Sequence, residues 1–367
     1  MPPRFPIEVS PSSHPTPTDE RSRVLASALG FGQIFTDHMV LIPFREREGW
    51  LPGALQPYAP IQIDPAAAVL HYGQSVFEGF KAFRQVTGDI ACFRPDANAK
   101  RFQHSARRLA MPEMPIDMFL QAAEILIQQD RDWVPSTRGT SLYLRPLLIA
   151  TECSLGVRPS REYQFILIAS PAGDYFRGGI KPVSVWVCDN YVRAAPGGTG
   201  EAKFGGNYAA SLIAQAEATQ RGCAQVVWLD AVHRDQIEEM GGMNIFFVLE
   251  SNGQTTLVTP KLSGSLLPGI TRESLLLIGP KLGYAVEERT ITLAEWISSA
   301  QAGQMTEAFA CGTAAVITPI GSMHGQHGET LIGDGQGGPV AQALRDYLLA
   351  IQYGEAQDLL GWMHRVC

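Results

Sequence analysis

A lysine within a run of glycines is the residue of this chain whose surroundings most strongly suggest chemistry. Lys203 lies in the segment Gly197–Tyr208, GGTGEAKFGGNY, where five glycines flank it. Glycines thin the backbone so that a bulky group can lie against it, and a lysine amine can form a Schiff base with a carbonyl-bearing cofactor. A mobile loop that carries a solvated lysine is the alternative, and this segment alone does not decide between the two.

A pair of carboxylates, Glu238 and Glu239, follows the lysine by 35 and 36 residues. The pair stands between two apolar runs, Ala224–Asp230 and Asn244–Glu250, which we interpret as strands that flank a polar turn. A carboxylate between buried strands is costly unless it is paired. Pyridoxal phosphate, when it serves as an electron sink, needs an anion beside its ring nitrogen. The pattern therefore indicates a pyridoxal phosphate site.

Two later segments could bind the phosphate of such a cofactor, or a second anion. Leu267–Arg272, LPGITR, opens a predicted helix and offers free backbone N–H groups, the positive end of the helix dipole and a hydroxyl group. Ala310–Ala315, ACGTAA, is a turn of small residues that could do the same. Each segment is weak by itself, but their order along the chain strengthens the interpretation.

The elements that must position these residues alternate between strand-like and helix-like patterns along the whole chain. This alternation predicts an α+β (α/β mixed) fold of two domains, with a crevice between them for the ligand. The predicted strands of the first half are 66–73, 143–150 and 163–170, and its predicted helices are 96–110 and 116–130. The second half opens with a strand, the glycine-rich loop and a helix that ends at Gly222, and further helices are predicted at 271–283, 293–303 and 339–354.

Composition sets the domain boundaries that we expect. The first twenty residues are rich in proline and predict a flexible N-terminal arm, 1–20. A small α/β domain should follow at 21–174, and a large α/β domain should occupy 190–367. Between them, glycine, proline and aspartate cluster and predict an inter-domain linker at 175–189.

Length and charge exclude several classes of protein. The chain has 367 residues, of which 45% are hydrophobic and 18% are charged, so it has ample material for a core. A net charge of −7 without a long basic run argues against a nucleic-acid partner. No apolar stretch is long enough to span a membrane. Six scattered cysteines without a CxxC pair predict neither a disulfide framework nor a metal site, and favour a cytoplasmic location.

Taken together, the motifs resemble those of branched-chain amino acid aminotransferases, within the class IV (D-alanine aminotransferase-like) fold group of pyridoxal phosphate enzymes. The resemblance covers nearly the whole chain, from Phe31 to Ile320. The matching segments are FGQIFTDHM, HYGQSVFEGFKAFR, FRPDANAKRFQHSARRLAMP, LYLRPLL, GEAKFGGNYAASL, EMGGMNIFF, LLPGITRES and EAFACGTAAVITPI.

The resemblance implies a two-domain enzyme with the cofactor, pyridoxal 5'-phosphate, at the domain interface. Lys203 corresponds to the Schiff-base lysine and is the expected catalytic residue. The other expected cofactor contacts are Glu239 at the ring nitrogen, Tyr208 at the phenolic oxygen, and Arg101, Ile270, Thr271 and Thr313 at the phosphate.

The same resemblance implies a reversible transfer of the amino group of leucine, isoleucine or valine to 2-oxoglutarate, which yields the branched 2-oxo acid and glutamate. The positions that correspond to the substrate pocket are Phe31, Tyr72, Tyr143, Arg145, Tyr175 and Ala314. The family pocket is completed by the partner subunit of a homodimer, so that Tyr143 and Arg145 could act in trans.

Two departures from the family pattern affect what we expect. The turn after Glu239 often carries Thr where this chain has Gly242, which leaves the size preference of the pocket open. Some animal members carry a redox CxxC beside the phosphate turn, but Cys311 here stands alone, so we predict no thiol switch.

Three other functions are weighed against this one. A D-amino acid aminotransferase or an aminodeoxychorismate lyase of the same fold group would match the segments His71–Arg84 and Leu142–Leu148 poorly. An NAD-dependent enzyme could use the GxGxxG run Gly333–Gly338, but too few residues follow that run to complete a nucleotide-binding half. A non-catalytic protein would not need the intact set of cofactor residues.

Overall fold

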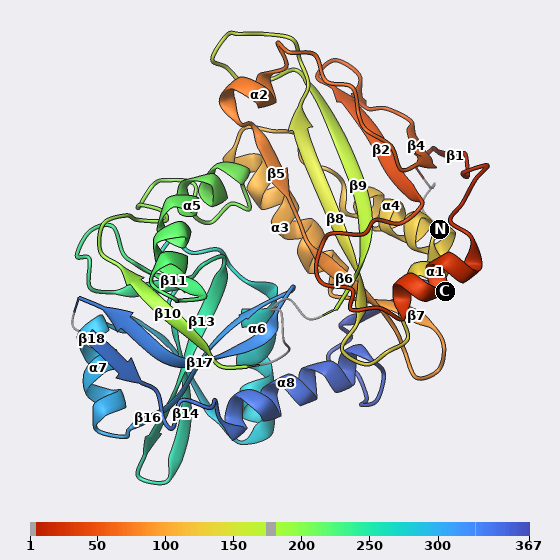
Figure 1. Cartoon of the computed structure of the whole chain (residues 1–367). Helices are drawn as coiled ribbons and strands as arrows, with labels where there is room; N and C mark the ends of the chain where they lie inside the picture. Colours follow the sequence, from red (N-terminus) through yellow and green to blue (C-terminus); the bar gives the residue numbers. More distant parts are fainter. Residues whose placement is uncertain (1–4, 174–180, 327) are drawn as a thin grey trace. The chain divides into compact units, whose positions relative to one another are not determined.

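The computed structural model describes residues 5–173, 181–326 and 328–367, and the chain divides into two compact units (Figure 1). Unit 1 is formed by Met1–Arg177, Ala202–Gly205 and Ala350–Cys367. Unit 2 is formed by Gly178–Glu201 and Gly206–Leu349. Each unit contains one mixed sheet with helices packed on it, so the predicted α+β fold class is confirmed.

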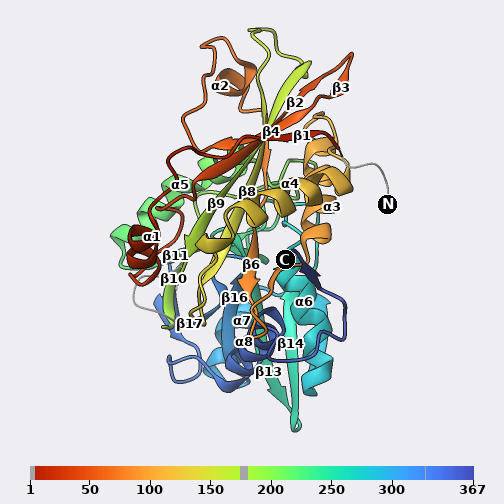
Figure 2. The ribbon, with the colours of Figure 1, turned by 90° about the vertical axis from the view of Figure 1, so that its right-hand side faces the viewer.

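The sheet of unit 1 is mostly antiparallel, and its longest strands, β8 and β9, pair along their whole length (Figure 2). Its main strand order is β1-β4-β2-β9-β8-β6-β7-β19, with β3 beside β2 and β5 beside β8. The strands are β1 (Ile7–Val9), β2 (His38–Arg45), β3 (Gly49–Trp50), β4 (Gly53–Pro57), β5 (Ser75–Phe77), β6 (Phe80–Arg84), β7 (Ile90–Phe93), β8 (Ser141–Ala150), β9 (Glu162–Ala172) and β19 (Met363–Arg365).

Two helices cover this sheet and close the core of unit 1. The helices of the unit are α1 (Thr18–Leu25), α2 (Ala68–Tyr72), α3 (Pro95–Arg108) and α4 (Ile116–Gln129), with a short 3₁₀ turn at Arg131–Trp133. Phe102 of α3 and Phe119 of α4 both contact the ring of Phe165 on β9, with centroid distances of 5.9 and 6.3 Å. Aromatic side chains of both predicted helices therefore face the sheet.

The N-terminal segment differs from the flexible arm predicted over residues 1–20. Its described part begins with β1, which pairs in parallel with β4. The amide of Ser12 then donates to Nε2 of the buried His38, and Thr16 donates from both its amide and its hydroxyl group to Asp37. Proline richness excludes a regular helix or central strand, but it does not prevent side chains of the sheet from binding the segment.

The sheet of unit 2 combines parallel and antiparallel pairs. Its strand order is β12-β11-β10-β17-β16-β13-β14-β15, with β18 beside β17. The strands are β10 (Val183–Cys188), β11 (Gln225–Leu229), β12 (Ile237–Met240), β13 (Met243–Ser251), β14 (Gln254–Pro260), β15 (Ala285–Arg289), β16 (Met305–Gly312), β17 (Val316–Gly325) and β18 (Gly328–Leu331).

Aromatic side chains fill the core of unit 2. Phe246 on β13 stacks on Phe309 of the neighbouring β16, and Phe247 meets the fully buried Trp296 of α7. The helices of this part of the chain are α5 (Gly205–Gln220), α6 (Ile270–Ile278), α7 (Leu293–Gln301) and α8 (Pro339–Gln352), with a 3₁₀ turn at Gly279–Leu282. Among the described residues, none of the helices has the length and apolar character needed to cross a membrane.

Two secondary-structure predictions are wrong, and each has a physical reason. The sequence predicts a strand at residues 66–73, but they contain α2, because a short apolar run does not distinguish a strand from a helix. Gly73, in the left-handed conformation (φ 63°), ends this helix. The two glutamates predicted in a polar turn lie on β12 instead. Two adjacent glutamates do not look like a buried strand in the sequence, because the residues that pair with them are distant along the chain.

The domain boundaries predicted from the sequence stay a prediction. The predicted domains are continuous stretches of chain, whereas each compact unit combines separate segments. Unit 1, for example, includes Ala202–Gly205 and Ala350–Cys367. The predicted linker 175–189 lies partly outside the described residues, and its later part contains β10 of unit 2.

Candidate active site

The backbone of Lys203 is fixed in unit 1 from two sides. Its amide donates to Oγ of Ser105 on α3 at 2.9 Å, and its carbonyl accepts a hydrogen bond from the amide of Phe77 at 3.0 Å. The ammonium Nζ lies 5.1 Å from the centroid of the Phe77 ring, within cation–π range. The side chain is half-buried. The backbone of Lys203 is thus held in place by residues of unit 1.

Arg101, the expected phosphate ligand, is a buried residue of α3. Its Nε and Nη2 donate to the two carboxylate oxygens of Glu78 at 2.7 and 2.9 Å. Glu78 is itself fully buried, and such a two-point pair fixes the plane of the guanidinium group. Glu78 therefore orients Arg101.

Tyr143 and Arg145 lie two residues apart on β8, so their side chains share one face of the sheet. The Phe31 ring meets the Tyr143 ring edge-on at 4.8 Å. The Arg145 guanidinium lies 4.9 Å from the ring centroid of Phe77 and 5.3 Å from that of Tyr143, and its Nη2 donates to the Tyr143 hydroxyl at 3.1 Å. Its buried Nε has no hydrogen-bond partner among the described residues.

A glycine makes room for this arrangement. A Cβ atom built on Gly79 would coincide with the hydroxyl group of Tyr143 and lie 2.6 Å from its Cζ. The tyrosine hydroxyl, which accepts from Arg145, therefore occupies the space of a side chain at position 79.

Among the described residues, no hydrogen bond or ring contact with this group is seen for Tyr72, another expected pocket residue. Tyr72 ends α2, is 42% exposed, and donates its hydroxyl hydrogen to the carbonyl of Leu155. Tyr175 lies outside the described residues.

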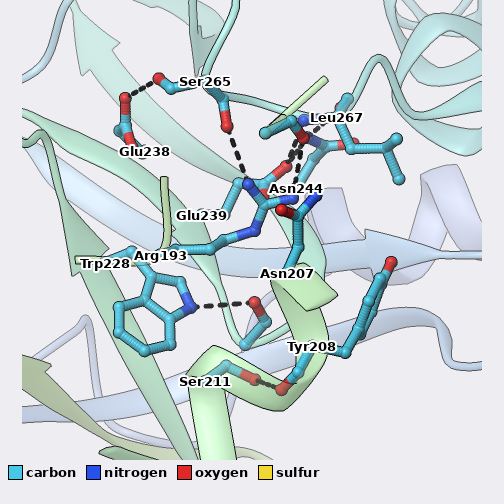
Figure 3. A network of polar contacts seen from close by, with 12 residues as sticks. Arg193, Asn207, Tyr208, Ser211, Trp228, Glu238, Glu239, Asn244, Ser265 and Leu267 are labelled. Atoms are coloured by element: carbon cyan, nitrogen blue, oxygen red, sulfur yellow. Dashed lines mark hydrogen bonds and ion pairs between the residues drawn. The ribbon is translucent and has the colours of Figure 1, made fainter. Parts of the chain in front are cut away.

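In unit 2, Glu239 on β12 is almost completely buried and is held by one ion pair and two hydrogen bonds (Figure 3). Nε of Arg193 lies 2.6 Å from its Oε2, and both side chains are at most 5% exposed. Its Oε1 accepts from Nδ2 of Asn244 at 3.1 Å and from the amide of Leu267 at 2.9 Å. The charge and the hydrogen bonds of these partners offset the desolvation of the carboxylate.

Arg193 also binds the loops on either side of Glu239. Its Nη1 donates to the carbonyl of Ser265 at 2.7 Å, and its Nη2 donates to the carbonyl of Gly200 at 3.2 Å. A Cβ atom on Gly200 would lie 2.6 Å from Cβ of Ala194 and would overlap the Ser265 carbonyl. The close approach of these two segments therefore requires glycine at position 200.

The expected phosphate-binding residues of unit 2 begin α6 and form a turn. Ile270 and Thr271 are the first two residues of α6, whose leading N–H groups have no acceptor one turn earlier in the helix. Thr313 and Ala314 lie in the turn between β16 and β17. In the ladder between β13 and β16, Cys311 pairs with Asn244, which itself contacts Glu239. The turn with Thr313 therefore begins two residues after the partner of Asn244.

Tyr208 lies on α5 and packs against the turn that follows Glu239. A Cβ atom on Gly242 would lie 3.1 Å from Cε1 of the Tyr208 ring, which is tighter than an ordinary contact. Glycine at this position therefore lets the tyrosine ring rest against the backbone.

Cys311 is fully buried. Burial raises the pKa of its thiol well above the usual range, which disfavours the reactive thiolate.

The glycine run Gly333–Gly338 leads into α8. The Glu307 carboxylate accepts hydrogen bonds from the amides of Val340 and Ala341 at the start of this helix, both at 2.8 Å. These amides at the start of α8 would otherwise be available to a pyrophosphate group, so the run does not form a nucleotide-binding loop.

Sequence reasoning did not single out Arg193, Asn244 or Glu78, although each contacts an expected site residue. Arg193 and Glu78 are buried charges, and such charges require partners, but their burial is not visible in the local sequence. Asn244 is the second residue of the otherwise apolar start of β13, where an amide is unusual.

Known proteins of similar sequence identify the family of this chain. Residues 75–323 match the model of the family described as amino-transferase class IV. The chain belongs to the class IV aminotransferases. It is 58% identical, over 98% of its length and 99% of the relative, to the branched-chain-amino-acid aminotransferase of Mycolicibacterium smegmatis (strain ATCC 700084 / mc(2)155).

Solved structures of class IV aminotransferases share the fold. The branched-chain amino acid aminotransferase of Escherichia coli aligns with a TM-score of 0.74 and 28% identity, over 89% of this chain and 99% of that one. The branched-chain amino acid aminotransferase of T.th., complexed with N-(5'-phosphopyridoxyl)-L-glutamate, aligns with a TM-score of 0.70 and 28% identity, over 89% and 98% of the two chains.

Proposed function

We propose that this chain is a pyridoxal 5'-phosphate-dependent branched-chain amino acid aminotransferase. It moves the amino group of leucine, isoleucine or valine to 2-oxoglutarate and produces the branched 2-oxo acid and glutamate. The observation that carries the proposal is the 58% identity, over nearly the whole of both chains, to a relative with that name.

The residues present fit the cofactor chemically. Glu239 is a buried carboxylate held by an ion pair and two hydrogen bonds, which suits the protonated ring nitrogen of the cofactor. The first N–H groups of α6, at Ile270 and Thr271, suit its phosphate, as do Arg101 and the turn at Thr313. Tyr208 suits its phenolic oxygen. When bound, pyridoxal phosphate supplies an electron sink for the bond broken at the substrate α-carbon.

The remaining chemistry belongs to this chain's own residues. Lys203 would hold the cofactor through its Nζ, and the same amine would move a proton to and from the substrate as a general base and acid. Glu239 would stabilise a positive ring nitrogen, so its contribution would be electrostatic.

The central test concerns Lys203. Borohydride reduction of the yellow protein should attach the chromophore to Lys203, as mass spectrometry of the digested protein would show. Lys203→Ala should bind the cofactor without a covalent bond and lose about three orders of magnitude or more in turnover. Near-wild-type turnover in this variant would remove the assignment.

The substrate pocket must accept both an apolar side chain and the carboxylate of glutamate. An apolar pocket alone would desolvate that carboxylate without compensation. We assign Arg145 to this carboxylate, because its guanidinium group lies among aromatic rings and its buried Nε has no hydrogen-bond partner in the described part of the chain. Phe31, Tyr72, Tyr143, Tyr175 and Ala314 are proposed as further contacts of the substrate.

Single-turnover kinetics with leucine and with glutamate separate this role from a structural one. Arg145→Met should lower kcat/KM for glutamate by an amount that corresponds to about 2 kcal/mol or more of transition-state stabilisation, the scale of a lost charge-assisted hydrogen bond. The kcat/KM for leucine should change much less. Tyr143→Phe removes the hydroxyl partner of Arg145 and leaves its charge, so this variant separates the orientation of the guanidinium group from its charge. Equal losses for both substrates would assign Arg145 to structure.

The proposal includes a homodimer in which pocket residues are shared. If Arg145 acts in trans, mixing and reassembling Lys203→Ala and Arg145→Met subunits should restore glutamate-dependent activity at about a quarter of the sites, since about half of the dimers are mixed and each carries one intact site. Recovery should be absent if Arg145 serves its own subunit.

A cytoplasmic location is also proposed. It is supported by the six cysteines, all of which are free thiols.

A further inference from the structure

Arg193 joins β12, which carries Glu239, to the loops that contain Gly200 and Ser265. Its Nε contacts the Glu239 carboxylate at 2.6 Å, while Nη1 and Nη2 donate to the carbonyls of Ser265 and Gly200. Figure 3 shows the guanidinium group between Glu239 and the segment that contains Ser265. All of these groups belong to unit 2.

The location of the pair determines what the guanidinium charge can do. Glu239 is 2% exposed, and a carboxylate at such depth tends to take up a proton unless a nearby positive charge and hydrogen bonds favour its ionised form. Asn244 and the Leu267 amide donate hydrogen bonds but carry no net charge. Arg193 brings a positive charge into contact with this carboxylate, and an arginine stays charged at any working pH.

We propose that Arg193 is a positioning residue that keeps Glu239 ionised and oriented, and thereby sets the protonation of the cofactor's ring nitrogen. This inference rests on the proposed function, because it assumes that pyridoxal phosphate binds beside Glu239. An ionised Glu239 stabilises the positive charge of a protonated ring nitrogen through a charge-assisted hydrogen bond, whereas a protonated carboxyl group would offer its own hydrogen to an unprotonated nitrogen.

The geometry requires arginine at this position. Three acceptors in three directions match the planar fork of a guanidinium group, and a lysine ammonium could not reach all of them from one stem. The contact with Gly200 ties the glycine-rich loop, three residues before Lys203, to the same group. One residue thus supports the ring-nitrogen partner and the loop that leads to the reactive lysine.

The test measures ring protonation directly. Wild-type protein and Arg193→Gln are loaded with pyridoxal phosphate that carries 15N in the ring, and the 15N chemical shift is recorded from pH 6 to 9. Wild type should give the shift of a protonated ring across this range, and Arg193→Gln should give the unprotonated shift over most of it. A wild-type protein that binds no cofactor would instead contradict the proposed function.

Arg272→Gln is the matched control for the loss of a buried arginine. Arg272 is 3% exposed and donates to the Pro260 carbonyl and the Glu288 carboxylate rather than to Glu239. This variant should lose stability but keep the protonated ring. The inference is overturned if Arg193→Gln keeps the wild-type 15N shift while it loses as much stability as the control.

A binding cycle decides the matter if Arg193→Gln holds the cofactor weakly. Dissociation constants of pyridoxal phosphate are measured by equilibrium dialysis for Arg193→Gln, Arg193→Lys, Glu239→Gln and the double variant Arg193→Gln/Glu239→Gln. The Arg193→Gln change should weaken binding about tenfold in the wild-type background and by less than about threefold beside Glu239→Gln, since it acts through that carboxylate. Losses that multiply would show that Arg193 acts independently and would refute the inference. Arg193→Lys, which keeps the charge, should retain more ring protonation than Arg193→Gln.

Discussion

At Glu239 a carboxylate that is 2% exposed forms an ion pair with Arg193 and accepts hydrogen bonds from Asn244 and the Leu267 amide, whereas its neighbour Glu238 faces the opposite side of β12. Glu238 bonds the hydroxyl of Ser265, and burial raises its pKa above the ordinary value. Two adjacent glutamates therefore have different environments because side chains alternate along a strand.

This difference predicts the outcome of paired substitutions. Glu239→Gln should leave the fold intact but slow the single-turnover reaction with leucine by about 100-fold or more, since its charge matters most as charge develops in the reaction. Glu238→Gln, the matched control, should change the rate less than about threefold, because it replaces a carboxyl group that burial already pushes towards its neutral form. Equal rates in the two variants would contradict the assignment of Glu239.

Gly242 predicts an effect on substrate size. Gly242→Thr adds a Cβ atom 3.1 Å from the Tyr208 ring, so the ring must move. We expect a loss of about 1 kcal/mol in stability and a change in the ratio of kcat/KM for leucine to that for valine. Urea unfolding and a substrate panel would measure both, with Gly242→Ala to separate the Cβ atom from the rest of the side chain. An unchanged ratio would show that position 242 does not control substrate size.

At the scale of elements, the connection from β11 to β12 depends on one carboxylate. Asp230 accepts backbone N–H bonds from Val232, His233, Asp235 and Gln236. Burial acts to raise its pKa, but these four bonds outweigh burial and lower the pKa to about 2. The native state therefore favours the ionised form more than the unfolded chain does.

The sign of this pKa shift gives a pH-dependent prediction. The stabilisation, about 2 kcal/mol, is complete above the unfolded pKa and is lost as the pH falls from about 4 towards 2. Asp230→Asn should therefore be less stable than wild type by about this amount at pH 7. The gap between the two proteins should narrow at pH 3. Urea unfolding at pH 7, 5 and 3 would measure it, and a gap that stays constant with pH would refute the ionic origin.

The same element shows where sequence reasoning reaches its limit. The lysine loop, the start of α6 and the turn after β16 could all be predicted, because glycine, proline and threonine at loop positions have local causes. The strand β12 could not, since it is stabilised by partners distant in sequence, Arg193 and the Leu267 amide. Local patterns reveal which residues are suited to chemistry, but not what pairs with them.

At the scale of the whole molecule, the chain does not fold as consecutive pieces. The C-terminal residues Ala350–Cys367 belong to unit 1, where β19 pairs with β7. Trp362 is 8% exposed, its ring meets Phe93 edge-on, and its carbonyl accepts from the amide of Arg94. The sequence did not predict this return, because nothing local in a short strand specifies a partner 270 residues away.

This arrangement predicts the effect of a short truncation. Ending the chain at Gly361 removes β19 and the buried Trp362, and should cost about 3 kcal/mol or more. Hydrogen exchange should increase at β7, which lies about 270 residues earlier in the chain. Arg365→Ala, which removes an exposed ion pair with Asp89, is the control and should change stability by less than about 1 kcal/mol. Unchanged exchange at β7 after truncation would contradict the pairing.

The space shared by Gly79 and Tyr143 has a consequence for how such enzymes can diverge. Because the tyrosine hydroxyl fills the place of a side chain at position 79, the two positions cannot drift independently. Any larger residue at 79 displaces the hydroxyl group that accepts from Arg145, unless Tyr143 changes in the same lineage. In a library of variants, most substitutions of Gly79 should be tolerated only beside a smaller residue at 143. Residues 79 and 143 should therefore be inherited as a pair, although one of them has no side chain.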